Sequence, residues 1–157
     1  MPEPLITQVG ARIMSLNDPT KKMSKSEHNS KGTIYLKDDA ATIRKKIMSA
    51  KTDTLNNVKF DVENQPGISN LLTIYAALKD ISIQAAEEEC AGLQYGTFKG
   101  KVADVIIATL TPIQSRYQAV IDSPQLAQTL QDGAQKARIG ATQTLRDVQK
   151  AMGLELF

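Results

Sequence analysis

The chain has 157 residues, of which 19 are basic and 17 acidic, so its formal net charge at pH 7 is only +2. This length suits one domain, or one domain with a piece of another, and it can bury a core. A balanced charge does not demand a polyanionic partner, and the absence of Trp disfavours stacking on single-stranded nucleic acid. No apolar run approaches the roughly 20 residues of a membrane span, so we expect no membrane partner.

Residues 1–17 are predicted to be extended and loop-like, with Ile13 to Leu16 forming a short strand or the end of one. Residues 18–33 are predicted to form a loop, because Pro19 and Gly32 punctuate a stretch of Ser, Thr, Asn and Lys. His28 has no second His or Cys at ligand spacing, so a solvated surface histidine is expected there and no metal site. A brief extended segment, 33–36, should follow.

Within this loop, Lys22-Met23-Ser24-Lys25-Ser26 places two lysines three residues apart among hydroxyl side chains. One interpretation is a solvated lysine-rich loop. The other is a flexible cationic loop that closes over phosphates, because ammonium groups are compact point charges and nearby N–H groups and hydroxyls add hydrogen bonds. A lysine that meets the charge on departing pyrophosphate mainly in the transition state raises the rate. Removing one such contact typically costs about 3 kcal/mol.

A first helix is expected from residue 37 onward, with Asp38 or Asp39 as its N-cap. Its apolar face is expected to hold Ala40, Ile43 and Ile47, opposite Lys45 and Lys46. The basic cluster 44–46 lies in the C-terminal half of this helix, where cations complement the helix dipole. Two interpretations remain open, a solvated helix face and a contact with phosphates.

Residues 51–65 are polar and rich in turn formers, with Phe60 and Val62 as the expected apolar anchor. Pro66 suits the first position of a second helix. The apolar stripe of this helix comprises Ile68, Leu71, Leu72, Tyr75 and Leu78. Ser82 is expected to cap a short helix that carries the acidic run 87–89 on its outer side. It ends near the only cysteine, Cys90, which excludes an internal disulfide, is typical of a reducing cytosol and is expected to be structural.

Two longer helices close the chain. The first should bury a stripe made of Val102, Val105, Ile106, Thr109, Ile113, Tyr117 and Val120. Pro112 is expected to kink or interrupt it. The second should start at Ser123-Pro124 and end at Gly153. It carries a narrow apolar seam suited to packing lengthwise on another helix, namely Leu126, Leu130, Ala134, Ala137, Ala141, Leu145, Val148 and Met152.

Residues 22–26 are identical to the KMSKS loop of class I aminoacyl-tRNA synthetases. The flanking segments resemble bacterial tryptophanyl-tRNA synthetases in particular, and the resemblance runs from about Val9 to the end of the chain. These segments are Gly10–Leu16 with Asp18-Pro19-Thr20, then Pro66–Leu72, then Ala151–Leu154. A tyrosine-specific relative is one alternative, although the Gly10–Leu16 segment argues against it. A free-standing, non-catalytic helical module that binds tRNA or another partner is the other.

The resemblance implies an enzyme that activates L-tryptophan with ATP and transfers it to tRNA(Trp), acting as a cytoplasmic homodimer. It implies that Lys22, Met23, Ser24, Lys25 and Ser26 bind ATP, and that the backbone of Ile13 contacts adenine. Lys22 and Lys25 would be catalytic, with Lys25 on the transferring phosphates. Mg²⁺ would arrive with ATP rather than occupy a protein cage. Candidate contacts with tRNA phosphates are Arg44, Lys45, Lys46, Lys99, Lys101 and Arg116.

The expected fold is therefore mainly α. Residues 1–36 would form a short α/β tail that ends the catalytic domain and carries the KMSKS loop. Residues 37–157 would form a helical bundle of the anticodon-binding type, with the last helix, 124–152, packing back. The other nucleotide signature of the family needs two histidines, and this chain has one. We therefore expect the Rossmann catalytic half to be absent, which makes the chain a C-terminal fragment that is inactive alone.

Overall fold

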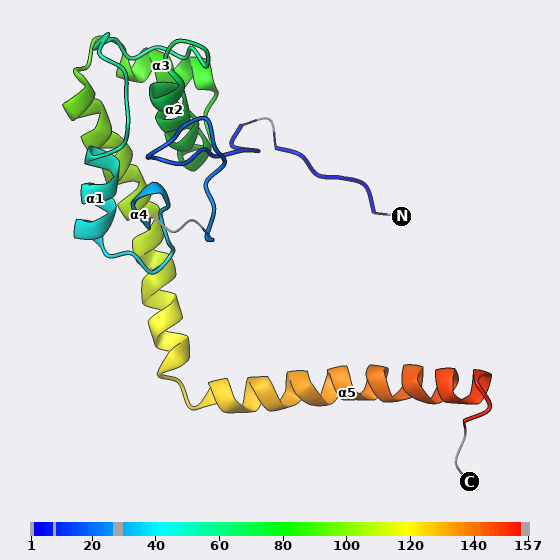
Figure 1. Ribbon diagram of the computed structural model, residues 1–157. Coiled ribbons are helices and arrows are strands. Elements are labelled where there is room, and N and C mark those ends of the chain that lie inside the picture. Colours follow the sequence, from blue (N-terminus) through cyan, green and yellow to red (C-terminus); the bar gives the residue numbers. More distant parts are fainter. Residues whose placement is uncertain (1, 8, 27–29, 155–157) are drawn as a thin grey trace. The chain divides into compact units, whose positions relative to one another are not determined.

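The computed structural model describes residues 2–7, 9–26 and 30–154. Across these ranges the chain forms α-helices, a single 3-10 turn and no named strand, as Figure 1 shows, which confirms the mainly α expectation. The elements are η1 (Ser30–Gly32), α1 (Ala40–Met48), α2 (Pro66–Lys79), α3 (Ile83–Cys90), α4 (Tyr95–Ile121) and α5 (Gln125–Ala151). The chain divides into two compact units, 1–114 and 115–157. The boundary expected after residue 36 stays a prediction.

The helix starts follow from local sequence. Asp39 caps α1 by accepting the N–H of Thr42 at 2.6 Å, and Ser82 caps α3 by accepting the N–H of Ala85 at 3.1 Å. Pro66 occupies the first turn of α2, where its missing N–H costs nothing. The start signals predicted for these three helices are thus confirmed.

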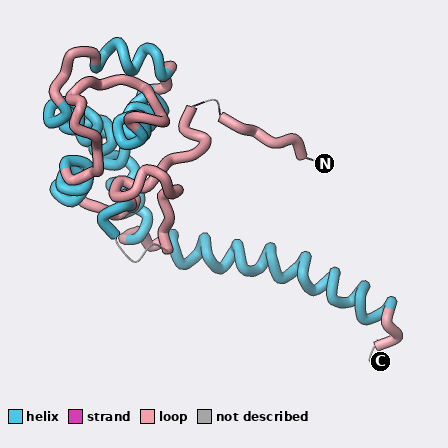
Figure 2. Tube along the Cα trace, turned by 45° about the horizontal axis from the view of Figure 1, so that its top comes forward, coloured by secondary structure: helices cyan, strands magenta, loops and turns pink. Residues whose placement is uncertain are grey.

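The core of the first unit lies among α1, α2, α3 and the first turns of α4, and Figure 2 shows only helices and connecting loops in this unit's described part. Its largest fully buried apolar side chains are Phe98, Ile43, Ile47, Ile68, Leu71, Leu72, Val102 and Cys90. The anchor expected for residues 51–65 was wrong. Val58 is 3 % exposed, whereas Phe60 is 36 % exposed and Val62 is 62 % exposed.

Helix α4 continues through Pro112, so the expected interruption is wrong, whereas the alternative expectation of a kink stays a prediction. A proline removes only one backbone N–H, and long helical stretches lie on both sides of it. The predicted apolar stripe is buried or half-buried as far as Thr109, next to buried Leu110, whereas Ile113, Tyr117 and Val120 are exposed. Periodicity predicted the right face, but it did not predict where burial stops.

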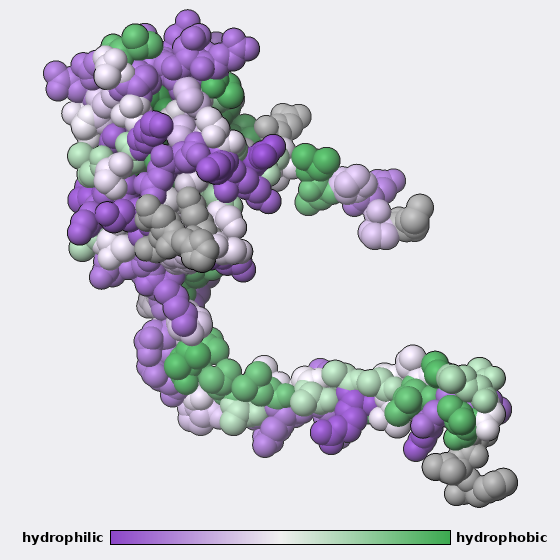
Figure 3. All heavy atoms as spheres, in the orientation of Figure 1, coloured by the Kyte–Doolittle hydropathy of each residue, from purple (hydrophilic) through white to green (hydrophobic). Residues whose placement is uncertain are grey.

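In the second unit, one side of α5 is hydrophobic and the other hydrophilic, as Figure 3 shows. The helix starts one residue later than expected, with Pro124 rather than Ser123 at the N-cap and no side-chain cap. Gly153, at φ +69°, ends it as predicted. The N–H of Leu154 donates to the Gln149 carbonyl at 2.8 Å, which closes a Schellman motif. No described residue of α5 is buried, so the packing expected for its seam stays a prediction.

Candidate functional site

Residues 13–23 fold back on themselves, and we call them the lead-in turn. The N–H of Ser15 donates to the Lys21 carbonyl at 2.8 Å, and the N–H of Met23 donates to the Ile13 carbonyl at 3.0 Å. An isolated antiparallel bridge pairs Met14 with Lys22. The first two residues of the KMSKS motif therefore lie directly opposite Ile13 and Met14.

Asp18 organises the tip of the lead-in turn. Its carboxylate accepts the Thr20 hydroxyl at 2.6 Å and the Thr20 N–H at 3.2 Å, and it pairs with the Lys21 ammonium at 3.2 Å. The hydrogen bonds from Thr20, and then that from Lys21, lower the pKa of Asp18 to about 2. Pro19 supplies the fixed φ that such a turn favours. Lys21 is thus engaged locally, unlike the lysines of the motif.

Lys22 and Lys25 are both exposed, and neither makes a hydrogen bond or ion pair with another residue of the described ranges. Ser24 and Ser26 are exposed beside them, and the Ser24 hydroxyl accepts the N–H of Ser26 at 3.3 Å. No carboxylate described here competes for the two ammonium groups. This set of donors fits a triphosphate, because it combines free cations with hydroxyls on one short loop.

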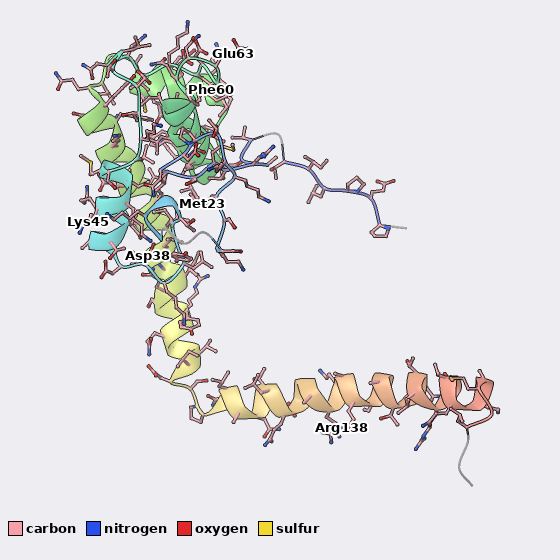
Figure 4. The ribbon with its side chains drawn as sticks, viewed as in Figure 1. Met23, Asp38, Lys45, Phe60, Glu63 and Arg138 are labelled. Carbon is pink, nitrogen blue, oxygen red and sulfur yellow. The ribbon has the colours of Figure 1, made fainter. Side chains whose placement is uncertain are left out.

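Met23 differs from its neighbours because its side chain is half-buried and packs on the core. It is labelled in Figure 4. Together with Ile13, Ile34, Ile74 and other apolar side chains it lines a hollow of about 370 Å³. Met23 thus fastens the motif to the unit, while Lys22 and Ser24 on either side of it remain exposed to solvent.

The chain beyond the motif returns to it through Thr33. The buried Thr33 hydroxyl donates to the Ser24 carbonyl at 2.9 Å, and the N–H of Leu16 donates to the Gly32 carbonyl at 2.9 Å. Lys46 of α1 donates to the Thr33 carbonyl at 2.8 Å and to the Asp38 carboxylate at 2.6 Å. Both sides of the motif are therefore tied to the first unit.

The expectation that Lys46 lies on the outer face of α1 was wrong, because its side chain is only 9 % exposed. Its charge is compensated inside the unit, since the ammonium pairs with Asp38 and also lies 4.8 Å from the centre of the Tyr35 ring. Lys45, by contrast, is exposed on the outer side of α1, as Figure 4 shows.

The other candidate phosphate contacts likewise divide into cations that are engaged within the protein and cations that are exposed to solvent. Lys99 is buried and donates to the Ala50 carbonyl at 2.8 Å, just beyond the end of α1, and burial lowers its pKa. Arg44 pairs with Asp104. Lys101 is exposed and makes only a 3.5 Å bond to a backbone carbonyl, and Arg116 is exposed as well. Lys45, Lys101 and Arg116 are thus the cations best placed to meet a polyanion.

Sequence reasoning missed one residue of this site, Asn70 of α2. It is buried and bonds both backbone groups of Met14 in the lead-in turn. Periodicity gave no signal for its burial, since Asn70 lies on the side of α2 away from the stripe of Ile68, Leu71, Leu72, Tyr75 and Leu78. Nothing local indicated its partner, which lies 56 positions away in the sequence.

Across residues 2–7, 9–26 and 30–154, no group of three His, Cys, Asp or Glu side chains is placed to hold a metal ion. In the same ranges no helix has both the length and the apolar character needed to cross a membrane. His28 lies outside the described residues, so its expected exposure stays a prediction.

The helical fold agrees with comparisons to known proteins. A family model described as tRNA synthetases class I (W and Y) matches residues 1–111. The chain therefore belongs to this family of class I synthetases.

Two curated relatives are tryptophan–tRNA ligases. The ligase of Halalkalibacterium halodurans is 53 % identical over 154 residues, which cover 98 % of this chain and 47 % of the relative. That of Bacillus subtilis is 50 % identical over the same length and coverage. The crystal structure of tryptophanyl-tRNA synthetase from Mycoplasma pneumoniae matches with a TM-score of 0.73 at 33 % identity, covering 95 % of this chain and 45 % of that one. The chain thus spans about half the length of the relatives it matches.

Proposed function

We propose that this chain forms part of a tryptophan–tRNA ligase, which activates L-tryptophan with ATP to the adenylate and transfers it to tRNA(Trp). The observation that carries the proposal is a pair of exposed lysines, Lys22 and Lys25. Their ammonium groups have no hydrogen-bond or ion-pair partner among the described residues, and hydrogen bonds on both sides fix the loop that carries them. Membership of the family supports ATP as the substrate. The names of the relatives support tryptophan over tyrosine, and an enzyme over a free-standing binding module.

The motif acts on the phosphates. Lys22, Met23, Ser24, Lys25 and Ser26 bind ATP, through the ammonium groups, the hydroxyls and the backbone. Lys25 meets the charge that grows on pyrophosphate as it leaves, and this interaction raises the rate because it strengthens in the transition state. Lys22 supports it from the arm of the lead-in turn that pairs with Met14.

Ile13 places the base of the nucleotide. Its backbone contacts adenine, and its carbonyl accepts the N–H of Met23. This bond fixes the distance between the adenine contact and the phosphate-binding motif. Mg²⁺ is held by the phosphates of ATP rather than by a protein cage, since Mg²⁺ keeps several waters and takes few protein ligands.

The helical part serves tRNA. Residues 1–36 end the catalytic domain, and residues 37–157 form the anticodon-binding domain, with the segment 124–152 packing back beside the catalytic domain. Lys45, Lys101 and Arg116 contact tRNA phosphates. The complete enzyme is a cytoplasmic homodimer without a membrane partner. The 157 residues alone bind ATP weakly and are inactive, because half of a phosphate site loses most of its preorganisation.

The test is tryptophan-dependent exchange of pyrophosphate into ATP. The assay compares the 157-residue chain, the complete enzyme that contains it, and the Lys25→Ala variant of that enzyme. We expect an inactive chain, an active enzyme and a variant slowed about a hundredfold or more. Tryptophan-dependent exchange by the chain alone would contradict the proposal that it holds only half of the phosphate site and is inactive by itself. An unchanged rate in Lys25→Ala would contradict the role of the motif and favour a non-catalytic module.

A further inference from the structure

We propose that Asn70 is a positioning residue for the nucleotide site, which holds the lead-in turn so that Ile13 and the KMSKS motif meet the same ATP molecule. The inference rests on the proposed function and assigns a role to a residue that does not itself touch the substrate.

The geometry is a two-point clamp. The side-chain oxygen of Asn70 accepts the N–H of Met14 at 2.8 Å, and its amide nitrogen donates to the Met14 carbonyl at 2.8 Å. Asn70 is 5 % exposed, so water is a poor substitute for either bond. An amide side chain suits this task because it offers one acceptor and one donor side by side, as a neighbouring β-strand would.

Met14 is the residue through which this clamp acts on the site. Met14 directly follows Ile13, and the Ile13 carbonyl accepts the N–H of Met23. Met14 itself forms the β-bridge with Lys22 on the opposite arm of the turn. Fixing both backbone groups of Met14 therefore fixes the position of the Ile13 backbone and of the start of the motif. Through the clamp, helix α2 positions both proposed contacts with ATP, namely the Ile13 backbone at adenine and the KMSKS motif at the phosphates.

Asn70 is set in a fully buried stretch of α2. Ile68, Leu71 and Leu72 surround Asn70 along α2, and each is at most 1 % exposed. Asn70 consequently cannot follow the lead-in turn if the turn moves. A displacement of the turn by about 1 Å from its productive place is expected to cost up to a hundredfold in rate.

The sharpest variant is Asn70→Asp in the complete enzyme, because the carboxylate keeps the acceptor for the Met14 N–H, removes the donor to the Met14 carbonyl and turns a charged oxygen toward that carbonyl. Ser69→Ala is the matched control, since Ser69 is the neighbouring buried residue of α2 and its hydroxyl accepts the N–H of Asp61, away from the lead-in turn. Each variant is measured for KM of ATP, KM of tryptophan and kcat in pyrophosphate exchange, and for its thermal midpoint. Lys25→Ala is measured beside them.

We expect Asn70→Asp to lower kcat/KM for ATP about tenfold or more while KM for tryptophan stays unchanged. Ser69→Ala should lower the thermal midpoint and leave both KM values unchanged. An Asn70→Asp variant with an unaltered KM and kcat for ATP, while Lys25→Ala loses about a hundredfold, would overturn the positioning role alone. A Lys25→Ala variant at the wild-type rate would instead overturn the proposed function.

Discussion

The ammonium of Lys46 lies 2.6 Å from the carboxylate of Asp38, and the two side chains are only 9 % and 14 % exposed. The same ammonium donates a hydrogen bond to the Thr33 carbonyl. The hydroxyl of Thr33 in turn donates to the Ser24 carbonyl within the KMSKS motif. One buried cation on α1 thus organises the segment through which the chain returns from the motif.

The first prediction concerns this pair. Lys46→Met keeps the apolar stem but leaves Asp38 charged and unpaired in a nearly dry site, so the free energy of unfolding should fall by about 3 kcal/mol or more. Urea denaturation of the chain measures it. Lys45→Met, at the neighbouring exposed position, should stay within about 0.5 kcal/mol of the parent chain. An equal fall in the free energy of unfolding in the two variants would mean that the buried ion pair does not stabilise the chain more than an exposed lysine does.

The second prediction concerns close packing at Gly67, in the first turn of α2. A Cβ atom built there would lie 2.1 Å from the carbonyl oxygen of Lys51, and backbone cannot yield as a side chain can. Gly67→Ala should therefore destabilise the chain by about 3 kcal/mol. Gly100→Ala in α4 meets nothing within 4 Å, so it should stabilise the chain by about 0.5–1 kcal/mol. Thermal unfolding of both variants measures these changes in stability. An unchanged thermal midpoint in Gly67→Ala would show that the predicted clash with Lys51 does not occur.

The third prediction concerns pH. The folded-state pKa of Asp18, about 2, lies below its ordinary value of 3.8, so the charged form stabilises the lead-in turn. That contribution is fully present above pH 3.8 and is lost as the pH falls through about 2. Carboxyl NMR titration should report the low pKa directly. Thr20→Val removes the strongest hydrogen bond and should raise the pKa of Asp18 towards 3.8, whereas an unshifted pKa would assign its depression to another cause.

The fourth prediction concerns tRNA binding by the complete enzyme. Lys45→Ala removes an exposed cation, so the slope of log K against log salt should become shallower by roughly one phosphate contact. Lys99→Met removes a buried ammonium that is bonded to Ala50, so it should lower the stability of the enzyme and leave the slope unchanged. A slope that shifts for Lys99→Met and not for Lys45→Ala would reverse this assignment.

Local signals predicted the helices well. Asp39, Pro66 and Ser82 mark helix starts through hydrogen bonds and dihedral angles confined to one turn, so a few residues suffice to identify them. For residues 22–26, residue types and spacing left a solvated loop and a phosphate-binding loop both open, and it was the resemblance to the KMSKS loop that favoured the second.

What the sequence could not predict depends on distant partners. Lys46 is predicted to lie on the solvated face because of its charge, yet it lies three positions after buried Ile43, and Asp38 and Thr33 accept hydrogen bonds from its ammonium. Asn70 pairs with Met14, 56 positions away, and no local rule selects that partner. Ile113 continues an apolar stripe but is 45 % exposed, because hydrophobic periodicity predicts a face without its covering element.

Cys90 has a practical consequence. It is the only cysteine of the chain, it is fully buried, and burial raises the pKa of its thiol, so it should resist alkylation in the folded protein. A Ser26→Cys variant would then offer a maleimide dye the one reachable thiol of the chain, at an exposed position inside the KMSKS motif. Fluorescence from that dye would report changes in the surroundings of the motif when ATP is added, with Cys90 left in place.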